Sequence, residues 1–212
     1  MHKWITPVRK YKNDDSEGEI TEIRMVSEKD SQSSQLNGNR LYFYGNINNE
    51  IVLDWNKQLD DTSRSMRIMQ TMYDLEVPPP IYIYLQSNGG EIFAALSVLG
   101  RIESLKAQGF AIHTIVEGFC ASAGTLISVG GTKRLIRKYS CMMIHQLSGG
   151  AWGKYSELKD EQQNLDLLMK TIQDIYKKYT KINKSDLNEI LKHDIYLSAE
   201  NSLEKNLVDG II

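Results

Sequence analysis

Residues 81–116 alternate between strand and helix patterns, and this alternation limits the fold more than any other feature of the sequence. Apolar residues at every second position of 81–85 have the period of a strand. The Asn-Gly-Gly turn at 88–90 leads into apolar residues at helical spacing from 91 to 109, and another strand pattern covers 110–116. A crossover helix of this length joins parallel strands. The sequence therefore predicts an α/β domain with a parallel sheet.

The preceding segment supplies a further strand and a long helix. An aromatic strand is predicted at 40–44, and a helical pattern begins at 48. The prolines at 78–80 are expected to end this helix, because proline lacks the N–H that a helix needs. The apolar pattern is interrupted at 60–63, so we expect a break in the helix there.

The C-terminal half contains the longest predicted helix, at about 155–180. Its apolar residues recur at steps of three and four: Leu165, Leu168, Ile172, Ile175 and Tyr179. Such a seam packs either on its own domain or on a partner chain. Two short strands are predicted before it, at 134–137 and 141–144. After it, Ser185 is the predicted N-cap of a shorter helix, and a final strand is predicted at 207–212.

Length and charge narrow the class of protein. The 212 residues suffice for one domain with a sizeable core. We expect this domain at 37–212 and a polar N-terminal arm, either flexible or ordered on a partner, at 1–36. The formal net charge of -2 gives no electrostatic reason to expect nucleic acid or an anionic membrane as a partner. Cys120 and Cys141 lie in apolar surroundings and lack metal-ligand spacing, so we expect buried free thiols in a reducing compartment.

The sequence carries no signal for a membrane. No apolar run approaches the roughly 20 residues that span a bilayer, and the N-terminal residues lack the apolar core of a secretory signal. We expect a soluble, cytoplasmic protein.

A serine in a run of small residues is the first candidate for chemistry. Ser122 lies in segment 118–124, after a predicted strand and at the start of a helix, where free backbone N–H groups and the helix dipole favour an oxyanion. A nucleophilic serine also needs a base and a group that orients the base. His145 and Asp194 are of the right types. By itself, however, each of these three residues is more often structural than catalytic.

Other residues compete for the same roles. Among the other histidines, His2 lies in the N-terminal arm, His113 lies within a strand, and His193 points away from Asp194 if its segment is extended. Asp209 competes with Asp194 as the orienting group. The order Ser, His, Asp along the chain differs from the Ser, Asp, His order of α/β-hydrolases, so a lipase or esterase is disfavoured.

Six segments together resemble the family of Clp protease proteolytic subunits, ClpP. They are IYIYLQSNGG at 81–90, GFCASAG at 118–124, GGTKR at 130–134, MIHQLSGG at 143–150, DIYLSAE at 194–200 and LVDG at 207–210. The resemblance runs from about Leu41 to the C-terminus, in the family's order. It implies an α/β, ClpP/crotonase-like fold, a superhelix of repeated β-β-α units with a protruding handle helix at about 155–180.

The resemblance also implies the roles of the site residues. Ser122 is then the nucleophile, His145 the base and Asp194 the residue that orients the imidazole, because Asp209 matches a position that is not catalytic in the family. The amide N–H groups of Gly90 and Ala123 form the oxyanion hole. No metal or organic cofactor is implied, and ATP is consumed by a partner.

The same resemblance implies an assembly. Members of this family form heptameric rings, two of which stack through their handle helices. A hexameric AAA+ unfoldase of the ClpX or ClpA type delivers unfolded polypeptides to them. Residues 1–36 then act as an axial loop near the entrance pore, although this segment matches the family poorly. Neither nucleic acid nor a membrane is an expected partner.

Some residues depart from the family pattern and keep further interpretations open. Leu147 stands where relatives commonly have proline, and Glu91 adds a charge beside the glycine turn. The early helical region is longer than the corresponding helix of the family, which implies an insertion at about 60–65. A signal-peptide-peptidase-like or capsid-processing peptidase would use a Ser-Lys dyad, for which Lys133 is the nearest candidate. The chain could also be a catalytically silent ring subunit or an acyl-CoA enzyme on the same scaffold.

Overall fold

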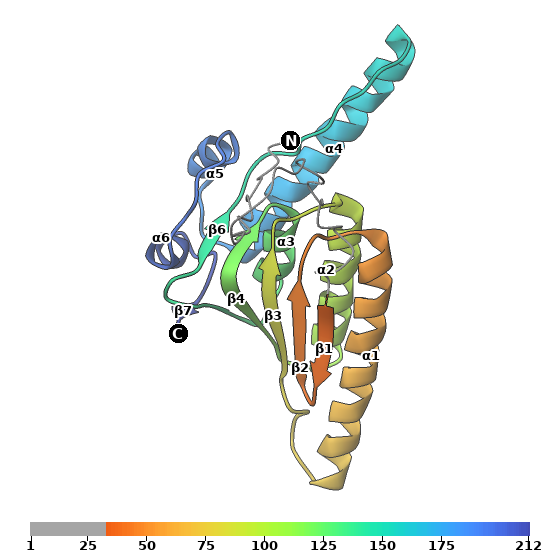
Figure 1. The fold of residues 1–212 in the computed structure, drawn as a ribbon, viewed down its shortest axis with the longest axis vertical. Coiled ribbons are helices and arrows are strands. Elements are labelled where there is room, and N and C mark those ends of the chain that lie inside the picture. The colour runs from red at the N-terminus through yellow and green to blue at the C-terminus, as the bar shows by residue number, and fades with distance from the viewer. Residues whose placement is uncertain (1–32) are drawn as a thin grey trace, which may run out of the picture. The chain divides into compact units, whose positions relative to one another are not determined.

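A computed structural model describes residues 33–212 (Figure 1). The predicted arm at 1–36 lies outside the described residues, except for 33–36, which belong to the first strand. The elements in chain order are β1 (Ser33–Asn37), β2 (Arg40–Tyr44), α1 (Asn49–Met72), β3 (Ile81–Ser87), α2 (Ile92–Ala107), β4 (Ile112–Ala121), α3 (Ala123–Val129), β5 (Lys133–Ile136), β6 (Cys141–Met143), α4 (Tyr155–Tyr179), α5 (Lys184–Leu191), α6 (Ala199–Glu204) and β7 (Gly210–Ile211).

The strands form one mostly parallel sheet, as predicted. Its order is β1-β2-β3-β4-β5-β7, and β6 pairs with β4. Among the described strands, only the β1–β2 hairpin is antiparallel. Besides β3, the long strand β4 has two further neighbours: it pairs with β5 through His113–Val116 and with β6 through Phe119–Ala121. The carboxyl ends of β4 and β6 therefore lie side by side.

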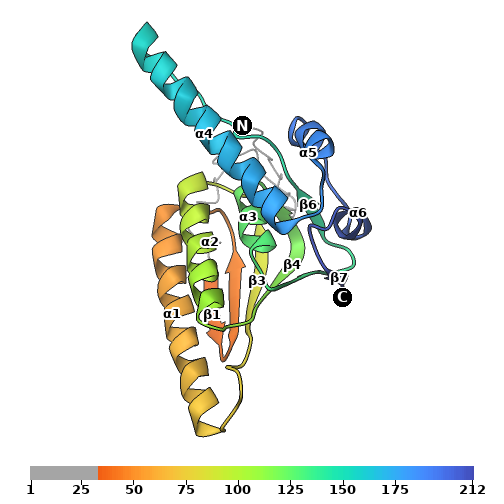
Figure 2. The same ribbon diagram turned by 180° about the vertical axis from the view of Figure 1, so that it is seen from behind.

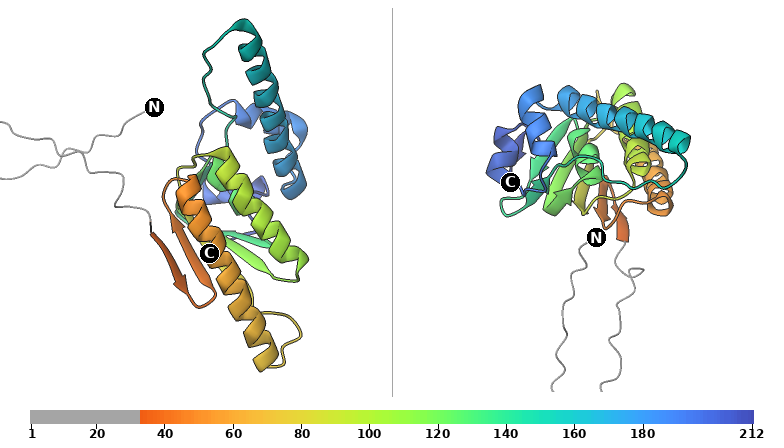
Figure 3. Two further views of the ribbon diagram at one scale, coloured as in Figure 1. Left: turned by 90° about the vertical axis from the view of Figure 1, so that its right-hand side faces the viewer. Right: turned by 90° about the horizontal axis from the view of Figure 1, so that it is seen from above.

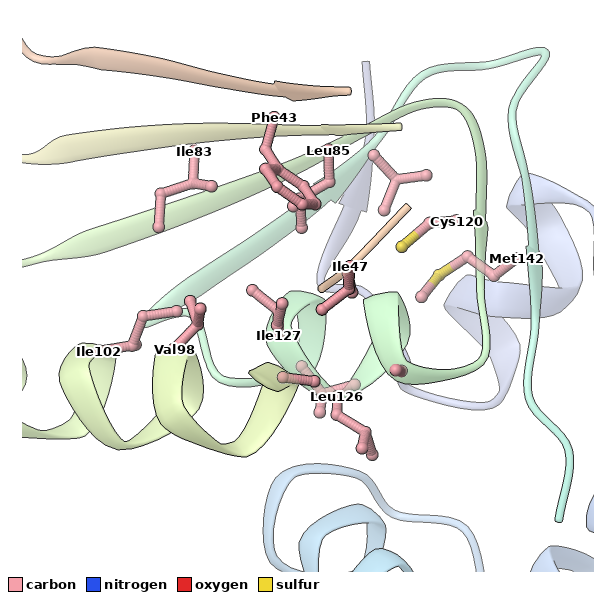
Figure 4. Close-up of a cluster of buried hydrophobic side chains, with 14 of the residues drawn as sticks. Phe43, Ile47, Ile83, Leu85, Val98, Ile102, Cys120, Leu126, Ile127 and Met142 are labelled. Carbon is pink, nitrogen blue, oxygen red and sulfur yellow. The ribbon is translucent and has the colours of Figure 1, made fainter. Parts of the chain in front are cut away.

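Helices α1, α2 and α3 cover one face of the sheet, as Figure 2 shows. The core lies between this face and the helices, where Ile83 and Leu85 from β3 meet Val98 and Ile102 from α2 (Figure 4). Burial of these side chains is the main favourable term in folding. The predicted apolar side of α1 is buried in the same core, and the Trp55 ring stacks on Phe43 with 4.2 Å between ring centroids. The α/β fold that the sequence predicts is thus the one observed.

The predicted break in α1 is wrong. The helix is continuous from Asn49 to Met72, because Thr62 and Met66 continue the buried face through the interruption of the apolar pattern. The acidic residues at the predicted break lie outside the core: the half-buried Asp60 pairs with Arg101 of α2, and the exposed Asp61 pairs with Arg64. The helix also ends before the prolines at 78–80 that were expected to stop it.

Helix α4 spans Tyr155–Tyr179, as predicted, and its first half extends beyond the sheet and the other helices (Figures 1 and 3). Of its residues only Ile172 and Tyr176 are fully buried. The residues from 155 to 160 are all exposed. The seam predicted along this helix therefore packs on its own domain near the C-terminal end only.

Two predictions near the C-terminus need correction. The N-cap of α5 is Asn183, whose side chain accepts a hydrogen bond from the Asp186 amide at 2.9 Å, and not Ser185. The short helix α6 was not predicted. It begins after Ser198, whose hydroxyl caps the Asn201 amide.

Candidate active site

Ser122 lies at a sharp turn between β4 and α3. Its backbone has φ 54° and ψ -128°, a conformation that costs a non-glycine residue about 1–3 kcal/mol and persists only where the surroundings hold it. The Ser122 amide donates to the Met143 carbonyl at 2.8 Å, and its carbonyl accepts from the Thr125 amide at 3.0 Å. The turn is thus held between β6 and α3.

The glycine pair after β3 lies against this turn. A Cβ atom at Gly89 would come within 2.6 Å of the Ser122 Cβ, and one at Gly90 would collide with the Ile47 carbonyl oxygen. Both glycines also have positive φ, which side chains disfavour. Ile47 fixes the loop, because its amide donates to the Gly89 carbonyl at 2.8 Å and its carbonyl accepts from the Glu91 amide at 2.9 Å. Only glycine permits this approach to the serine.

His145 and Asp194 form a hydrogen-bonded row with the serine. The Ser122 Oγ lies 2.7 Å from His145 Nε2, and His145 Nδ1 lies 2.9 Å from Asp194 Oδ1. The imidazole is mostly buried, with 20% of the side chain exposed, whereas the Asp194 side chain is 73% exposed. The three residues that the sequence singled out are therefore brought together.

Backbone pairing holds the two outer members of the row. His145 follows β6, and the next amide, that of Gln146, donates to the Leu191 carbonyl at 2.7 Å. Asp194 precedes Leu197, which exchanges two hydrogen bonds with Met142 of β6 at 2.9 and 2.7 Å. The segment carrying Asp194 thus runs beside the strand that carries His145.

This arrangement suits proton transfer from the serine. A carboxylate can only accept, so His145 Nδ1 donates to Asp194, and the neutral imidazole then accepts the Ser122 proton at Nε2. The first amide of α3, that of Ala123, has no partner within the helix. Gly90 and Ala123 line the same cavity as Ser122 and His145.

A cavity of about 210 Å³ opens beside the serine. Polar and apolar groups contribute about equally to its lining. The apolar residues come from α2, α3, α4 and the segment after β6, and they are Ile92, Leu126, Leu147, Ile172 and Tyr176; Gln146 and Ser148 are among the polar ones. Glu91 is the acidic residue among the lining side chains, and its Oε2 accepts from Asn49 at 2.7 Å. Leu147 uses an amide that proline would lack, since it donates to Met169 Sδ at 3.1 Å.

The competing residues lie elsewhere among residues 33–212. Asp209 is engaged by Arg134, whose Nε lies 3.0 Å from its Oδ2, and this ion pair lowers the pKa of Asp209. His193 contacts Glu189 at 3.3 Å. Lys133 begins β5 and pairs with His113, away from the carboxyl end of β4. His2 lies outside the described residues.

The two cysteines are free, as predicted, and Cys120 is fully buried. Burial raises the pKa of Cys120 to about 12, so its thiol is not ionised at neutral pH and does not compete as a nucleophile. Cys141 is only half-buried, which differs from the expectation that both would be buried.

Sequence reasoning missed a polar pair behind the serine. Thr125 and Tyr176 are both buried, and their hydroxyl oxygens are 2.6 Å apart. The predicted seam of α4 includes Tyr179 in place of Tyr176. The sequence offered one signal for this pair: Thr125 is a polar residue in the otherwise mostly apolar run that follows Ser122.

Two further observations concern ligands and membranes. Within residues 33–212, no three His, Cys, Asp or Glu side chains are grouped as a metal site requires. None of the helices in that range is both long and apolar enough to cross a bilayer.

Together, the mostly parallel sheet and the Ser-His-Asp row beside the carboxyl ends of β4 and β6 define an α/β protein whose candidate site has the geometry that serine hydrolases use. Comparison with known proteins gives the family. The model of the Clp protease family matches residues 36–212. The chain is also 30% identical over 172 residues to the ATP-dependent Clp protease proteolytic subunit of Chlorella vulgaris, covering 79% of this chain and 84% of that protein. The chain belongs to the Clp protease family, a family of peptidases.

Proposed function

We propose that this chain is a serine endopeptidase, the proteolytic subunit of a Clp-type protease that degrades unfolded polypeptides in the cytoplasm. The observation that carries the proposal is the continuous row from Asp194 through His145 to Ser122, beside a cavity large enough for a side chain. Membership of a peptidase family supports the same reaction.

In the proposed mechanism, Ser122 Oγ attacks the carbonyl carbon of the scissile peptide bond while its proton moves to His145 Nε2. The oxyanion accepts hydrogen bonds from the amides of Gly90 and Ala123, a contribution that is typically worth about 100- to 1,000-fold per donor. The C–N bond then breaks and the leaving amine takes the proton from His145. A water molecule activated by the same imidazole hydrolyses the acyl-enzyme.

The apolar part of the cavity lining supports a preference for substrates with an apolar side chain next to the scissile bond. This part includes Leu126, Ile172 and Tyr176, and burying an apolar side chain against it is favourable. The carboxylate of Glu91 at the same cavity disfavours an acidic side chain.

We further propose that the active form is an assembly of rings, two heptamers stacked through α4, that works with an AAA+ unfoldase of the ClpX or ClpA type. The exposed apolar side chains of α4, including Tyr155 and Leu167, support a partner for this helix. The unfoldase would consume ATP, so this chain needs no cofactor.

The test is mass spectrometry after treatment with a fluorophosphonate, which esterifies activated serines. We expect one adduct on Ser122 in the wild type and none in Ser122→Ala. His145→Ala should lose labelling and about 10⁶-fold in kcat on a short peptide, as when a serine peptidase loses its base. An oligomeric wild-type sample without an adduct would mean a catalytically silent subunit and would refute the proposal.

A further inference from the structure

Two buried hydroxyl groups lie directly behind the candidate nucleophile. Thr125 is in the first turn of α3 and Tyr176 is near the C-terminal end of α4, and both are almost completely excluded from solvent. The Tyr176 hydroxyl lies 2.6 Å from Thr125 Oγ1. This contact joins two helices through residues that are 51 positions apart.

The protons of this contact can be assigned from a second distance. Thr125 Oγ1 also lies 2.6 Å from the carbonyl oxygen of Ser122. A carbonyl oxygen carries no proton, so the single hydroxyl proton of Thr125 must point to it. The proton between the two hydroxyls therefore comes from Tyr176. Burial raises the pKa of Tyr176, which keeps this donor protonated.

The hydrogen bonds end on the residue whose backbone is strained. Ser122 has positive φ, and such a conformation persists where surrounding groups determine it. Its carbonyl oxygen accepts two hydrogen bonds, both from Thr125, through the amide and through the hydroxyl. The amide bond is part of the turn itself. The hydroxyl bond depends on the side-chain rotamer of Thr125, and Tyr176 is the group that holds this rotamer.

We infer that Tyr176 is a positioning residue: through Thr125 it holds the Ser122 turn in the orientation that aims Oγ at His145. This inference rests on the proposed function, because it concerns the same serine. Tyr176 is one of the residues that line the cavity, and its hydroxyl lies 2.6 Å from Thr125 Oγ1. Tyr176→Phe removes this hydroxyl and keeps the ring, so it tests the hydrogen bond alone.

The experiment compares four single variants and one double variant with the wild type. Tyr176→Phe and Thr125→Val each remove one hydroxyl at nearly constant shape, and Thr125→Ser keeps the hydroxyl. Tyr179→Phe is the matched control, since this tyrosine lies one helical turn later on α4 and does not line the cavity. The measurements are the rate of fluorophosphonate labelling of Ser122, and kcat and KM for a short peptide from about pH 5 to about pH 8, the range in which an imidazole ordinarily changes its charge.

For Tyr176→Phe and Thr125→Val we expect about a 10- to 100-fold loss of kcat and of labelling rate, in line with what small misplacements of reacting groups cost. KM should change little, and the midpoint of the pH profile should stay where it is, because the imidazole and its carboxylate are intact. Thr125→Ser and Tyr179→Phe should behave as the wild type. The double variant Tyr176→Phe/Thr125→Val should lose no more activity than the more damaged single variant. Both changes break the same chain of hydrogen bonds, which runs from Tyr176 through Thr125 to the Ser122 carbonyl.

Three results would overturn the inference, and they are distinguishable. If the wild type is labelled on Ser122 and Tyr176→Phe is labelled equally fast, the tyrosine does not position the serine, while the proposed function stands. If the wild type itself is not labelled, the proposed function fails and the positioning role fails with it. Equal losses in Tyr176→Phe and Tyr179→Phe would indicate a general loss of packing and would also count against the inference.

Discussion

At the scale of single residues, the side chains of the candidate triad differ in their exposure to solvent. His145 is mostly buried, whereas Asp194 lies at the surface of the chain. Water and ions weaken the interaction of an exposed carboxylate with its neighbours. The contribution of Asp194 to catalysis therefore comes mainly from orienting the imidazole. An asparagine in its place can fulfil this role better at an exposed position than at a buried one.

Asp194→Asn should lower kcat by about 100-fold, less than the roughly 10⁴-fold loss known where the corresponding aspartate is buried. The exposed amide can turn so that its oxygen still accepts from His145 Nδ1, which preserves the productive tautomer. The kcat of the purified variant is measured by peptide hydrolysis. Asp174→Asn on α4 is the control, because it removes the same charge away from the site. A loss as deep as that of Ser122→Ala would contradict the expectation.

Gly89 is a second residue whose role is local. Gly89→Ala should reduce labelling of Ser122 by at least about 100-fold, because the new methyl group would occupy space 2.6 Å from the Ser122 Cβ. Far-ultraviolet circular dichroism should show unchanged helix content.

Gly100→Ala is the matched control for Gly89→Ala. This glycine lies within α2, and an added Cβ would meet open space. The substitution should keep full labelling and should stabilise the domain by about 0.5–1 kcal/mol, because alanine is the better helix former. Full labelling of Gly89→Ala would show that the glycine loop can move away from the serine.

At the scale of elements, α2 and α4 are joined by a carboxylate between two lysines. Glu103 on α2 lies 2.8 Å from Lys106 and 2.6 Å from Lys178 on α4. Partial burial alone would raise the pKa of Glu103, but the hydrogen bonds from the two lysines outweigh it and bring the pKa to about 2, from an ordinary value of 4.5. The carboxylate and its two lysines therefore stabilise the fold in a pH-dependent way.

A carboxyl group whose pKa is lowered by folding contributes stability above its unfolded pKa and loses it as the pH falls toward the folded value. The contribution of Glu103 should thus be complete near neutral pH and fall between about pH 4.5 and about pH 2. Urea unfolding at about pH 6 and about pH 3.5 should show a smaller loss of stability for Glu103→Gln than for the wild type. Glu204→Gln, at an exposed position, is the control and should follow the wild type.

Periodicity predicted the elements that bury a continuous apolar face. It located β3, α2 and α4 because the exclusion of apolar side chains from water dominates there. It was wrong about α1, where a buried threonine replaced an apolar residue and acidic residues lay on the exposed side. It missed α6, since a helix of six residues has too few positions to show a period. The N-cap of α5 was misplaced because asparagine and serine cap equally well.

At the scale of the whole molecule, the candidate site joins segments that no local pattern connects. His145 is 23 residues from Ser122 and 49 from Asp194. Their types were read from the sequence, but their proximity depends on β4 and β6 being neighbours. The choice of Asp194 over Asp209 came from the resemblance, and the Arg134–Asp209 pair supplies the physical reason. The Thr125–Tyr176 contact was not predicted, because a tyrosine in an amphipathic helix indicates burial and not a particular partner.

The assembly that we propose can be tested on α4. Leu167→Glu should shift the protein from its assembled form toward smaller species in sedimentation velocity, because it places a charge on an exposed apolar position of this helix. Gln163→Glu introduces the same charge at another exposed position and should change sedimentation less. The fold of both variants should be intact by circular dichroism. An unchanged sedimentation profile for Leu167→Glu would exclude this part of α4 from the interface.

Helix α4 is packed on the domain near its C-terminal end and exposed at its N-terminal end, and this difference has a consequence for amide hydrogen exchange. Backbone hydrogen bonds open most easily where few buried contacts hold them. In an isolated chain, the amides between 155 and 165 should exchange through fraying, whereas those beyond Ile172 should exchange only when the domain opens. Association through α4 would slow the first group and leave the second almost unchanged. The difference in protection between the two ends of one helix therefore measures how much of it a partner covers.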